Sequence, residues 1–347
     1  MASYLRYARS RLRFIVPSGA ERIMRVFSEK ALSGFAVPIL AVFSVVFSSD
    51  AQSAEGTWSN RAPIPHARNE LMGAVVGNRI YAFGGADQEN YEVRLNHVYD
   101  PSTNAWSEAA PMPRGGNHLG VAAVDGKIYV VGGFRSRRHT EPTSDVFVYD
   151  PGADRWQELT PLPSARGAVG LAGLNGKLHA ITGRGDQGVI DAHDVYDIAT
   201  GTWSAAAPLP ITRDHVGIAV FAGKIHVFGG RLNETVENLG AHHVYDPMSG
   251  SWSEAAPVPT PRSAGAFAVA NNLLFFAGGE CTLDEKNFDQ VEAYDLGTDS
   301  WIDYGRMPRG LHGFVGAALG NELHFIGGSD PCGGGTKLDD HFVFTVQ

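Results

Sequence analysis

The chain has 347 residues, and 28 Lys and Arg against 37 Asp and Glu give it a formal net charge of −9. Nucleic-acid partners require a basic footprint, so the acidic balance disfavours them. With 44% hydrophobic residues and 42 glycines, the composition is that of a folded protein and not of a disordered one.

The first 54 residues differ from the rest of the chain. Residues 1–30 hold seven Lys and Arg and two acidic residues, residues 31–47 form an apolar stretch interrupted by Pro38, and small residues dominate positions 48–54. A basic region followed by an apolar run and small residues is typical of a secretory signal. The run is shorter than the roughly 20 residues that span a membrane. The sequence therefore predicts an export segment over residues 1–54, with an uncleaved anchor at 31–47 as the alternative.

Cleavage is expected after Ala51 or Ala54, and Met24 is an alternative start because a normal signal opening follows it. Removal of the first 51 residues takes away seven basic and three acidic groups and leaves 21 against 34, a net charge near −13. We expect a periplasmic or secreted protein with no stable membrane span after cleavage, whose folded domain covers residues 55–347. The sequence leaves the oligomeric state open, and a monomer is our expectation.

The rest of the chain is a sixfold repeat. Six tryptophans recur at spacings of 48, 50, 47, 49 and 49 residues: Trp58, Trp106, Trp156, Trp203, Trp252 and Trp301. A glycine pair, or its equivalent Thr182-Gly183, begins 26 residues after every tryptophan, and an aspartate stands six residues before each of the last five. A period near fifty residues with fixed internal offsets indicates a repeat architecture.

The second repeat illustrates the strands that each unit is expected to form. Residues 118–124 and 127–133 are apolar runs joined by Asp125-Gly126, a two-residue turn that predicts a hairpin because it needs positive φ. Residues 145–150 form the third strand, and a fourth carries the next tryptophan. One such antiparallel sheet cannot bury both of its faces, whereas sheets stacked radially bury them against one another in a propeller.

With its motifs GKIYVVGG and DVFVYDP, followed by a tryptophan, the unit resembles the Kelch repeat, which forms β-propellers. The resemblance recurs six times over residues 57–347, with Thr182 in place of a glycine and Thr345 in place of an aspartate as departures. It specifies a fold better than an activity, because Kelch propellers serve as binding platforms and less often as enzymes.

The two ends of the chain predict how the propeller closes. Residues 57–60 match a fourth strand, and residues 341–346 match a third strand with no fourth strand after it. Pairing between them would complete the last blade and remove an open edge. We therefore predict an all-β fold, a six-bladed Kelch-type β-propeller with four antiparallel strands per blade, whose last blade is closed by the N-terminal strand.

The chain has two cysteines, Cys281 and Cys332, which follow the glycine pairs of adjacent repeats. In an exported protein such a pair indicates one disulfide between neighbouring loops. Two free thiols are the alternative.

All length variation lies in the loops between second and third strands. These loops share one face of a propeller with the loops that precede the first strands. Variable loops on a constant scaffold commonly carry function, so the channel mouth on this face is the candidate site.

Arginines collect at this mouth. One lies eight or ten residues past each tryptophan, and the set is Arg68, Arg114, Arg166, Arg213, Arg262 and Arg309. The variable loops add Arg135, Arg137, Arg138, Arg184 and Arg231. Because arginine suits carboxylates, sulfates and phosphates, the first six are predicted to contact an anionic ligand, and the resemblance to Kelch binding modules implies the same. The structural alternative pairs them with loop acids such as Asp87 and Asp191.

Twelve residues past each tryptophan, the first strand begins near the channel. This position holds Glu70, His118, Ala168, His215, Ala264 and Gly313. A glutamate and histidines around a channel are candidate acid–base groups or metal ligands, so Glu70, His118 and His215 are the candidate catalytic residues. His312, one position earlier in the last repeat, is a candidate ligand contact. The simpler alternative is a polar, water-filled lining.

Several signals of enzymes are missing from the sequence. It has no CxxC pair, Walker loop or GxSxG elbow. An iron motif of the plant specifier type is also broken, because Phe288 stands where a histidine should follow Glu280 and Asp284. We therefore expect no metal and no cofactor.

These observations predict an exported propeller that acts as a binding module for an anionic glycan, peptide or protein. Kelch proteins exported by bacteria include a sialic acid mutarotase, so the resemblance implies an alternative, a sugar epimerase or mutarotase at the same mouth. Glu70, His118 or His215 would then carry the proton. A third alternative is an interaction protein that uses the outer edges of its blades.

Overall fold

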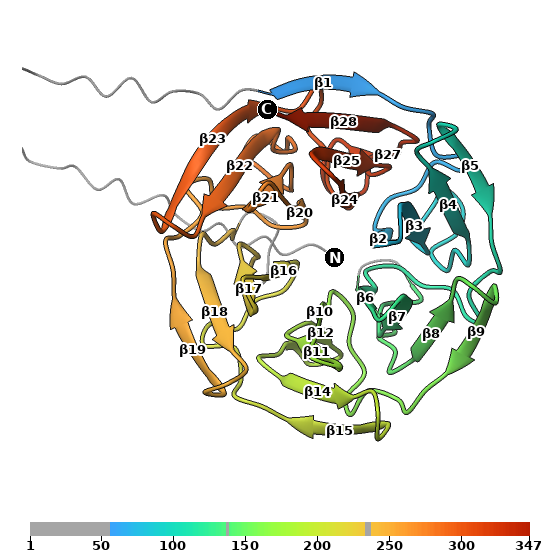
Figure 1. The fold of residues 1–347 in the computed structure, drawn as a ribbon, viewed down its shortest axis with the longest axis vertical. Helices are drawn as coiled ribbons and strands as arrows, with labels where there is room; N and C mark the ends of the chain where they lie inside the picture. The colour runs from blue at the N-terminus through green and yellow to red at the C-terminus, as the bar shows by residue number, and fades with distance from the viewer. Residues whose placement is uncertain (1–55, 137–138, 233–236) are drawn as a thin grey trace, which may run out of the picture. The chain divides into compact units, whose positions relative to one another are not determined.

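A computed structural model describes residues 56–136, 139–232 and 237–347. The predicted export segment, residues 1–54, and the loop residues Arg137 and Arg138 lie outside the described residues. The described part consists of β-strands arranged as six blades around a channel, as Figure 1 shows. It contains no helix that is long and apolar enough to cross a membrane.

Each blade is a four-stranded antiparallel sheet whose first strand lies nearest the channel and whose fourth lies outermost (Figure 1). Blade 1 contains β2 (Met72–Val76), β3 (Arg79–Phe83), β4 (Asn96–Asp100) and β5 (Ala105–Glu108). Blade 2 contains β6 (Gly120–Val124), β7 (Lys127–Val131), β8 (Val146–Asp150) and β9 (Arg155–Glu158). Blade 3 contains β10 (Gly170–Leu174), β11 (Lys177–Ile181), β14 (His193–Asp197) and β15 (Thr202–Ala205).

The second half of the ring repeats this plan. Blade 4 contains β16 (Gly217–Phe221), β17 (Lys224–Phe228), β18 (His242–Asp246) and β19 (Ser251–Glu254). Blade 5 contains β20 (Ala266–Ala270), β21 (Leu273–Ala277), β22 (Gln290–Asp295) and β23 (Ser300–Arg306). Blade 6 contains β24 (Val315–Leu319), β25 (Glu322–Ile326), β28 (His341–Val346) and β1 (Gly56–Asn60). Two short ribbons lie in loops, β12 (Arg184–Gly185) with β13 (Gly188–Val189) and β26 (Ser329–Asp330) with β27 (Thr336–Lys337).

The first and last strands of the described chain pair with each other. Strand β1 runs antiparallel to β28, with Trp58 opposite Phe344, and the two rings lie 4.9 Å apart between centroids. First strands of neighbouring blades contact one another around the whole ring, including β2 with β24. The predicted six blades and their closure by the N-terminal strand are confirmed.

The hydrophobic core lies between neighbouring blades. Phe83 and Val98 of blade 1, for example, pack in one cluster with Leu119, Ile128 and Tyr149 of blade 2. Five indole N–H groups reach back to carbonyls 43 to 46 residues earlier: Trp106 to Ala62, Trp156 to Ala110, Trp203 to Thr160, Trp252 to Ala207 and Trp301 to Ala256. The repeating tryptophan therefore joins successive blades both by apolar area and by a hydrogen bond.

The predicted disulfide is present. Cys281 in the β21–β22 loop of blade 5 bonds to Cys332 in the β26–β27 ribbon of blade 6, with the two Cα atoms 5.8 Å apart. Both loops lie on the face where second strands end, so the bridge ties two neighbouring blades at the channel mouth.

Candidate functional site

Six residues, each two positions before a first strand, encircle the channel. They are Glu70, His118, Ala168, His215, Ala264 and Gly313, all with a left-handed backbone at φ between 51° and 61°. The amide of Glu70 donates to the carbonyl of Gly313 at 2.7 Å, and the amide of His118 donates to the carbonyl of Glu70 at 3.1 Å. The same bond joins Ala168 to His118, Ala264 to His215 and Gly313 to Ala264. The left-handed backbone is thus a property of the repeat, because peptide hydrogen bonds form five of the six links of this ring.

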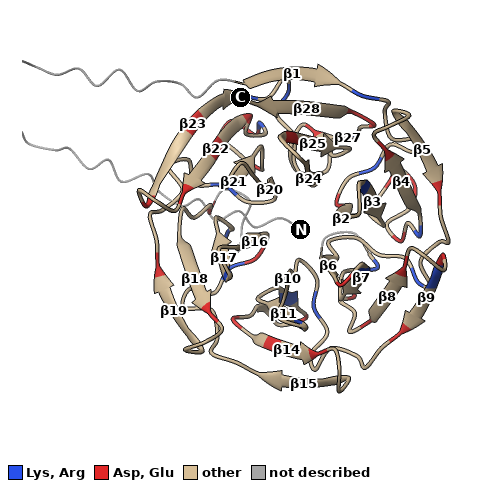
Figure 2. Cartoon of the chain, viewed as in Figure 1, with Lys and Arg blue, Asp and Glu red and all other residues tan. Residues whose placement is uncertain are grey.

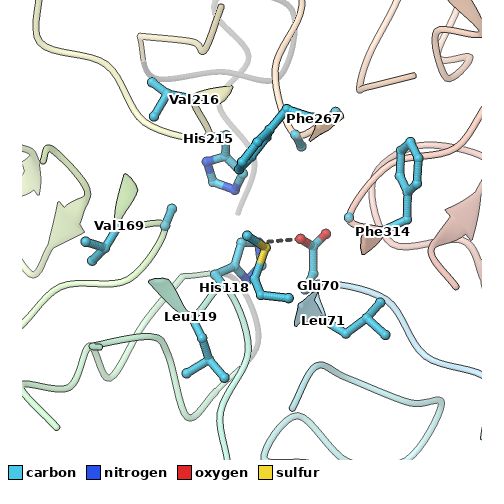
Figure 3. A pocket seen from close by; sticks show the side chains of 14 residues that line it. Glu70, Leu71, His118, Leu119, Val169, His215, Val216, Phe267 and Phe314 are labelled. Carbon is cyan, nitrogen blue, oxygen red and sulfur yellow. Dashed lines mark ion pairs between the residues drawn. The ribbon is translucent and has the colours of Figure 1, made fainter. Parts of the chain in front are cut away.

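This ring brings the three candidate catalytic residues together. Figure 3 shows that the side chains of Glu70, His118 and His215 point toward one another across the channel. Around them the channel wall is apolar, formed by Leu71, Leu119, Val169, Val216, Phe267 and Phe314. The polar groups therefore sit in a low-dielectric surrounding, which strengthens their electrostatic interactions.

A pocket with a volume of about 170 Å³ opens beside the ring, on the side of the β3–β4, β7–β8 and β17–β18 loops. Its polar lining comes from five of the six blades and comprises Asn69, Glu70, Tyr91, Asn117, His118, Ser136, His139, Arg231, Glu280, His312 and Lys337. This is the mouth at which the sequence predicted the site. Converging polar groups in a concave surface are typical of a binding site for a small molecule.

Glu70 and His118 form the first pair in the pocket. The amide nitrogen of Asn117 donates to the carbonyls of Tyr91 and Phe134, so its Oδ1 is left to accept from Nδ1 of His118 at 2.6 Å. Nε2 of His118 therefore carries a lone pair, and it lies 3.1 Å from Oε2 of Glu70. Burial lowers the pKa of His118 to about 3 and raises the pKa of Glu70 above its ordinary value. A neutral imidazole thus faces a carboxyl group that holds its proton more tightly than usual.

Arg231 is the centre of a buried ionic cluster on the other side of the pocket. Its guanidinium contacts the carboxylate of Glu280, approaches Oδ1 of Asp214 at 3.4 Å and donates to Nε2 of His215 at 3.0 Å. Nδ1 of His215 lies 2.9 Å from the same Oδ1 of Asp214. Arg231 and Asp214 are 2% and 0% exposed, so this cluster meets the general requirement that buried charges be paired.

Two carboxyl groups of the pocket have opposite proton affinities. Burial alone would raise the pKa of Glu280, but His312 and Arg231 hold it well below its ordinary value. Nε2 of His312 lies 3.5 Å from Glu280 and 3.7 Å from Glu70, so it connects the two acids. Two carboxyl groups whose pKa values are shifted in opposite directions can supply one acid and one base at the same site.

Four of the predicted ligand-binding arginines lie inside the blades. Arg68, Arg166, Arg213 and Arg262 are all 0% exposed. Their Nη2 groups donate to carbonyls of second strands at Ala82, Ala180, Val227 and Phe276, and three of them also donate through Nε to Gly84, Thr182 and Gly229. None of the four lines the pocket. This placement does not support ligand contact, and the partners also differ from the loop acids of the structural alternative, since Arg166 pairs with Asp194 and Arg262 with Glu292.

The other two predicted arginines lie on the surface of their blades. Arg114 pairs with Asp145 at 3.0 Å and with Glu158 at 2.6 Å, and Arg309 pairs with Asp340 at 3.1 Å. Neither belongs to the pocket lining. Figure 2 shows basic and acidic residues on every blade of the ring. Of the predicted ligand contacts, His312 is the one that lines the pocket.

Several residues of the site were not among the predicted catalytic residues or ligand contacts, including Asp214, Glu280, His139 and Lys337, and also Arg231, which the sequence placed at the mouth only as a loop arginine. A signal for three of them exists, because isolated β-bridges join the positions 11 and 28 residues past each tryptophan, as in Asp214 with Arg231 and Ser263 with Glu280. The two positions flank the ring in every blade. His139 has no counterpart at a fixed offset, because it belongs to a variable loop.

Comparison with known proteins agrees with this fold. A family model described as the KLHDC2/KLHL20/DRC7 Kelch-repeats domain matches residues 43–213. The solved structure of YjhT is similar with a TM-score of 0.70 at 18% sequence identity, and the match covers 83% of this chain and 100% of that one. At this identity the likeness concerns the fold alone. No curated protein sequence matches the chain.

Proposed function

Because the chain belongs to the Kelch-repeat β-propellers, we propose that it is a binding module and that its ligand is a small acidic glycan held in the mouth pocket. One observation carries the proposal, which is the convergence of polar side chains from five blades on a single pocket of about 170 Å³. A pocket of this size suits one sugar residue or one side chain and not a long segment of a partner.

The chemistry of the lining supports a sugar that carries a carboxylate. Carboxyl, amide and imidazole groups on Glu70, Asn69, Asn117 and His118 match the donors and acceptors of sugar hydroxyls. Lys337 adds an ammonium group to the wall, where its Nζ lies 3.4 Å from the carbonyl of Gly334. Arg231 and Lys337 are the basic residues of the pocket lining, and we assign Lys337 to the ligand carboxylate.

Thermal unfolding tests this proposal with matched ligands. We expect a sialic acid or a uronic acid to raise the melting temperature, since a ligand at 100 times its Kd adds about 2.7 kcal/mol, and we expect the neutral parent sugars to raise it less. Lys337→Met keeps the side-chain stem and should weaken the acidic sugar at least tenfold.

Lys224→Met is the control, because Lys224 lies in the β16–β17 turn on the opposite face and pairs with Asp246 at 3.0 Å. Equal weakening in both variants, or no response to any sugar, would contradict the proposal. A response to acidic peptides alone would favour a protein ligand, which is what Kelch propellers typically bind.

A sugar mutarotase is the second candidate, and the contact between Glu70 and His118 favours it. Mutarotation needs a base that removes the proton of the anomeric hydroxyl and an acid that protonates the ring oxygen as the ring C–O bond breaks. The neutral His118 imidazole can act as the base and the Glu70 carboxyl as the acid, and the two groups lie 3.1 Å apart. Glu70→Gln should then abolish enzyme-catalysed anomer exchange, measured by NMR, while ligand affinity changes little. Exchange at the uncatalysed rate in the wild type would leave binding as the function.

We also propose that the protein is exported. The disulfide between Cys281 and Cys332 supports this, because such bonds persist in oxidising compartments, and the signal-like segment over residues 1–54 points the same way. N-terminal sequencing of the mature protein should find cleavage after Ala51 or Ala54, and an intact segment in a membrane fraction would argue for the anchor.

A further inference from the structure

Three imidazoles meet at the axis of the propeller. His118 precedes β6, His139 lies in the β7–β8 loop and His215 precedes β16, and one ring nitrogen from each lies within 4.8 Å of the others. Their ring centroids are 4.7, 4.9 and 5.0 Å apart, and the rings stand nearly perpendicular to one another. We infer that these three histidines form a binding site for a divalent transition-metal ion of the zinc type. The inference goes beyond the proposed function, because neither glycan binding nor mutarotation calls for a metal.

The distance between two of the three histidines fits such an ion. Two ligand atoms bound tetrahedrally to zinc at about 2.0–2.1 Å lie roughly 3.3–3.4 Å apart. Nε2 of His118 is 3.2 Å from Nε2 of His139, close to this separation. Figure 3 shows the ring of His215 above His118, with the carboxyl group of Glu70 beside His118.

The outer partners orient two of these histidines as metal ligands are usually oriented. Nδ1 of His118 lies 2.6 Å from Oδ1 of Asn117, and Nδ1 of His215 lies 2.9 Å from Oδ1 of Asp214. An amide or carboxylate acceptor on one ring nitrogen fixes the tautomer and leaves the other nitrogen free to bind a metal.

The charges around the three rings accommodate a divalent cation. Glu70, Asp214 and Glu280 face them with carboxyl groups, against the guanidinium of Arg231. Nη2 of Arg231 donates a hydrogen bond to Nε2 of His215, at 3.0 Å. A metal ion on Nε2 of His215 would replace this hydrogen bond. Arg231 would keep its contacts with Glu280 and Asp214.

His139 is the residue that distinguishes a metal site from a polar channel lining. It holds a left-handed backbone at φ 56°, although it lies in a loop and takes no part in the peptide ring. A strained backbone at a non-glycine residue often marks a functional position. Phe134 packs against both His118 and His139, at 5.7 and 5.3 Å between ring centroids, and shields one side of the site from water.

Metal titration of the tag-free, chelator-treated full-length protein tests the inference. With Zn²⁺ in calorimetry we expect one ion per chain, and with Co²⁺ we expect the visible absorption of a four- or five-coordinate complex. His139→Ala should weaken Zn²⁺ at least about tenfold, because loss of even an outer-shell partner costs that much.

His66→Ala is the matched control, since His66 is an exposed histidine paired with Asp87 at the surface, and it should bind Zn²⁺ as the wild type does. An absence of stoichiometric binding in the wild type, or equal affinities in all three proteins, would overturn the inference. The Co²⁺ complex of the wild type gives a readout without any substitution. Three paramagnetically shifted imidazole N–H signals support a three-histidine site, and the absence of such signals refutes it.

Discussion

At the scale of single residues, Arg213 illustrates how a charge can serve the fold. Its guanidinium is fully buried and donates to the carbonyls of Gly229, Ile211 and Val227. Among the described residues it contacts no carboxylate, and burial lowers its pKa to about 10. The positive charge is stabilised by backbone dipoles alone, so the side chain locks the end of β17 to the segment before β16.

Arg213→Met should therefore destabilise the protein. The methionine stem fills much of the space but removes the donor that the guanidinium provides to the buried carbonyls of Gly229 and Val227, and we expect a loss of roughly 3 kcal/mol or more in the free energy of unfolding. Urea denaturation of wild type and variant measures it. Arg114→Met, which removes a half-exposed ion-paired arginine, should cost less than about 1 kcal/mol, and similar losses in both variants would refute the assigned role.

The arginines also mark what the sequence could not reveal at this scale. Their fixed offset from the tryptophan was visible, but their acceptors are backbone carbonyls, which leave no trace in the sequence. Glu70, His118 and His215 could be predicted because they occupy a ring position shared by all blades. Their partners Arg231 and Glu280 were visible only as members of loops, since their pairing depends on which blades are neighbours in the ring.

At the scale of elements, three blades contain a buried pair of histidines between their second and third strands. The pairs are His179 with His193, His226 with His242 and His324 with His341, each joined by a ring–ring hydrogen bond of 2.9 Å. Each third-strand histidine also lies 3.0 or 3.1 Å from a backbone carbonyl, as His242 does from Ala256. Blade 5 has Phe275 and Val291 at the same two places, which shows that the repeat accepts an apolar pair.

These pairs should make the propeller sensitive to acid. Burial lowers the pKa of His226 to about 4 and that of His242 to about 3, whereas the unfolded chain has the ordinary value near 6.5. Above pH 6.5 both histidines are neutral in the folded and in the unfolded state, so they do not reduce the free energy of unfolding. As the pH falls below 6.5 the unfolded state takes up protons that the folded state refuses, so stability is lost toward pH 4, by about 2 kcal/mol per histidine at pH 5.

The double variant His226→Phe with His242→Val, which copies the apolar pair of blade 5, should flatten this dependence. The measurement is the melting temperature between pH 7 and pH 4.5, in which the variant should lose less than the wild type. Parallel curves would mean that other groups control acid unfolding. The strands were predictable here because apolar runs and turn residues recur at fixed offsets, whereas the pairing of two histidines depends on the contact between two strands and was not predicted.

At the scale of the whole molecule, blade 6 is held from both sides. Strand β1 brings the beginning of the described chain into blade 6, and the ring returns to blade 1 through the segment that follows it. The disulfide between Cys281 and Cys332 ties the same blade to blade 5 across a separation of 51 residues. A propeller opens where its first and last blades meet, so the cross-link protects the blade beside that junction.

Removal of this cross-link should lower stability without changing the fold. A closed loop of this length restricts the unfolded chain, which stabilises the protein by about 4 kcal/mol in the chain-entropy model. Cys281→Ala with Cys332→Ala should therefore lower the free energy of unfolding by that amount, measured from the urea midpoint at pH 7. The variant changes the conformational freedom of the unfolded chain and not the folded structure, so the native circular dichroism spectrum should stay the same. Reduction of the wild type should reproduce the effect of the double variant. An oxidised wild type that unfolds at the same midpoint as both would show that the bridge adds nothing, and the mouth loops would then be held by the peptide ring and the buried ion pairs alone.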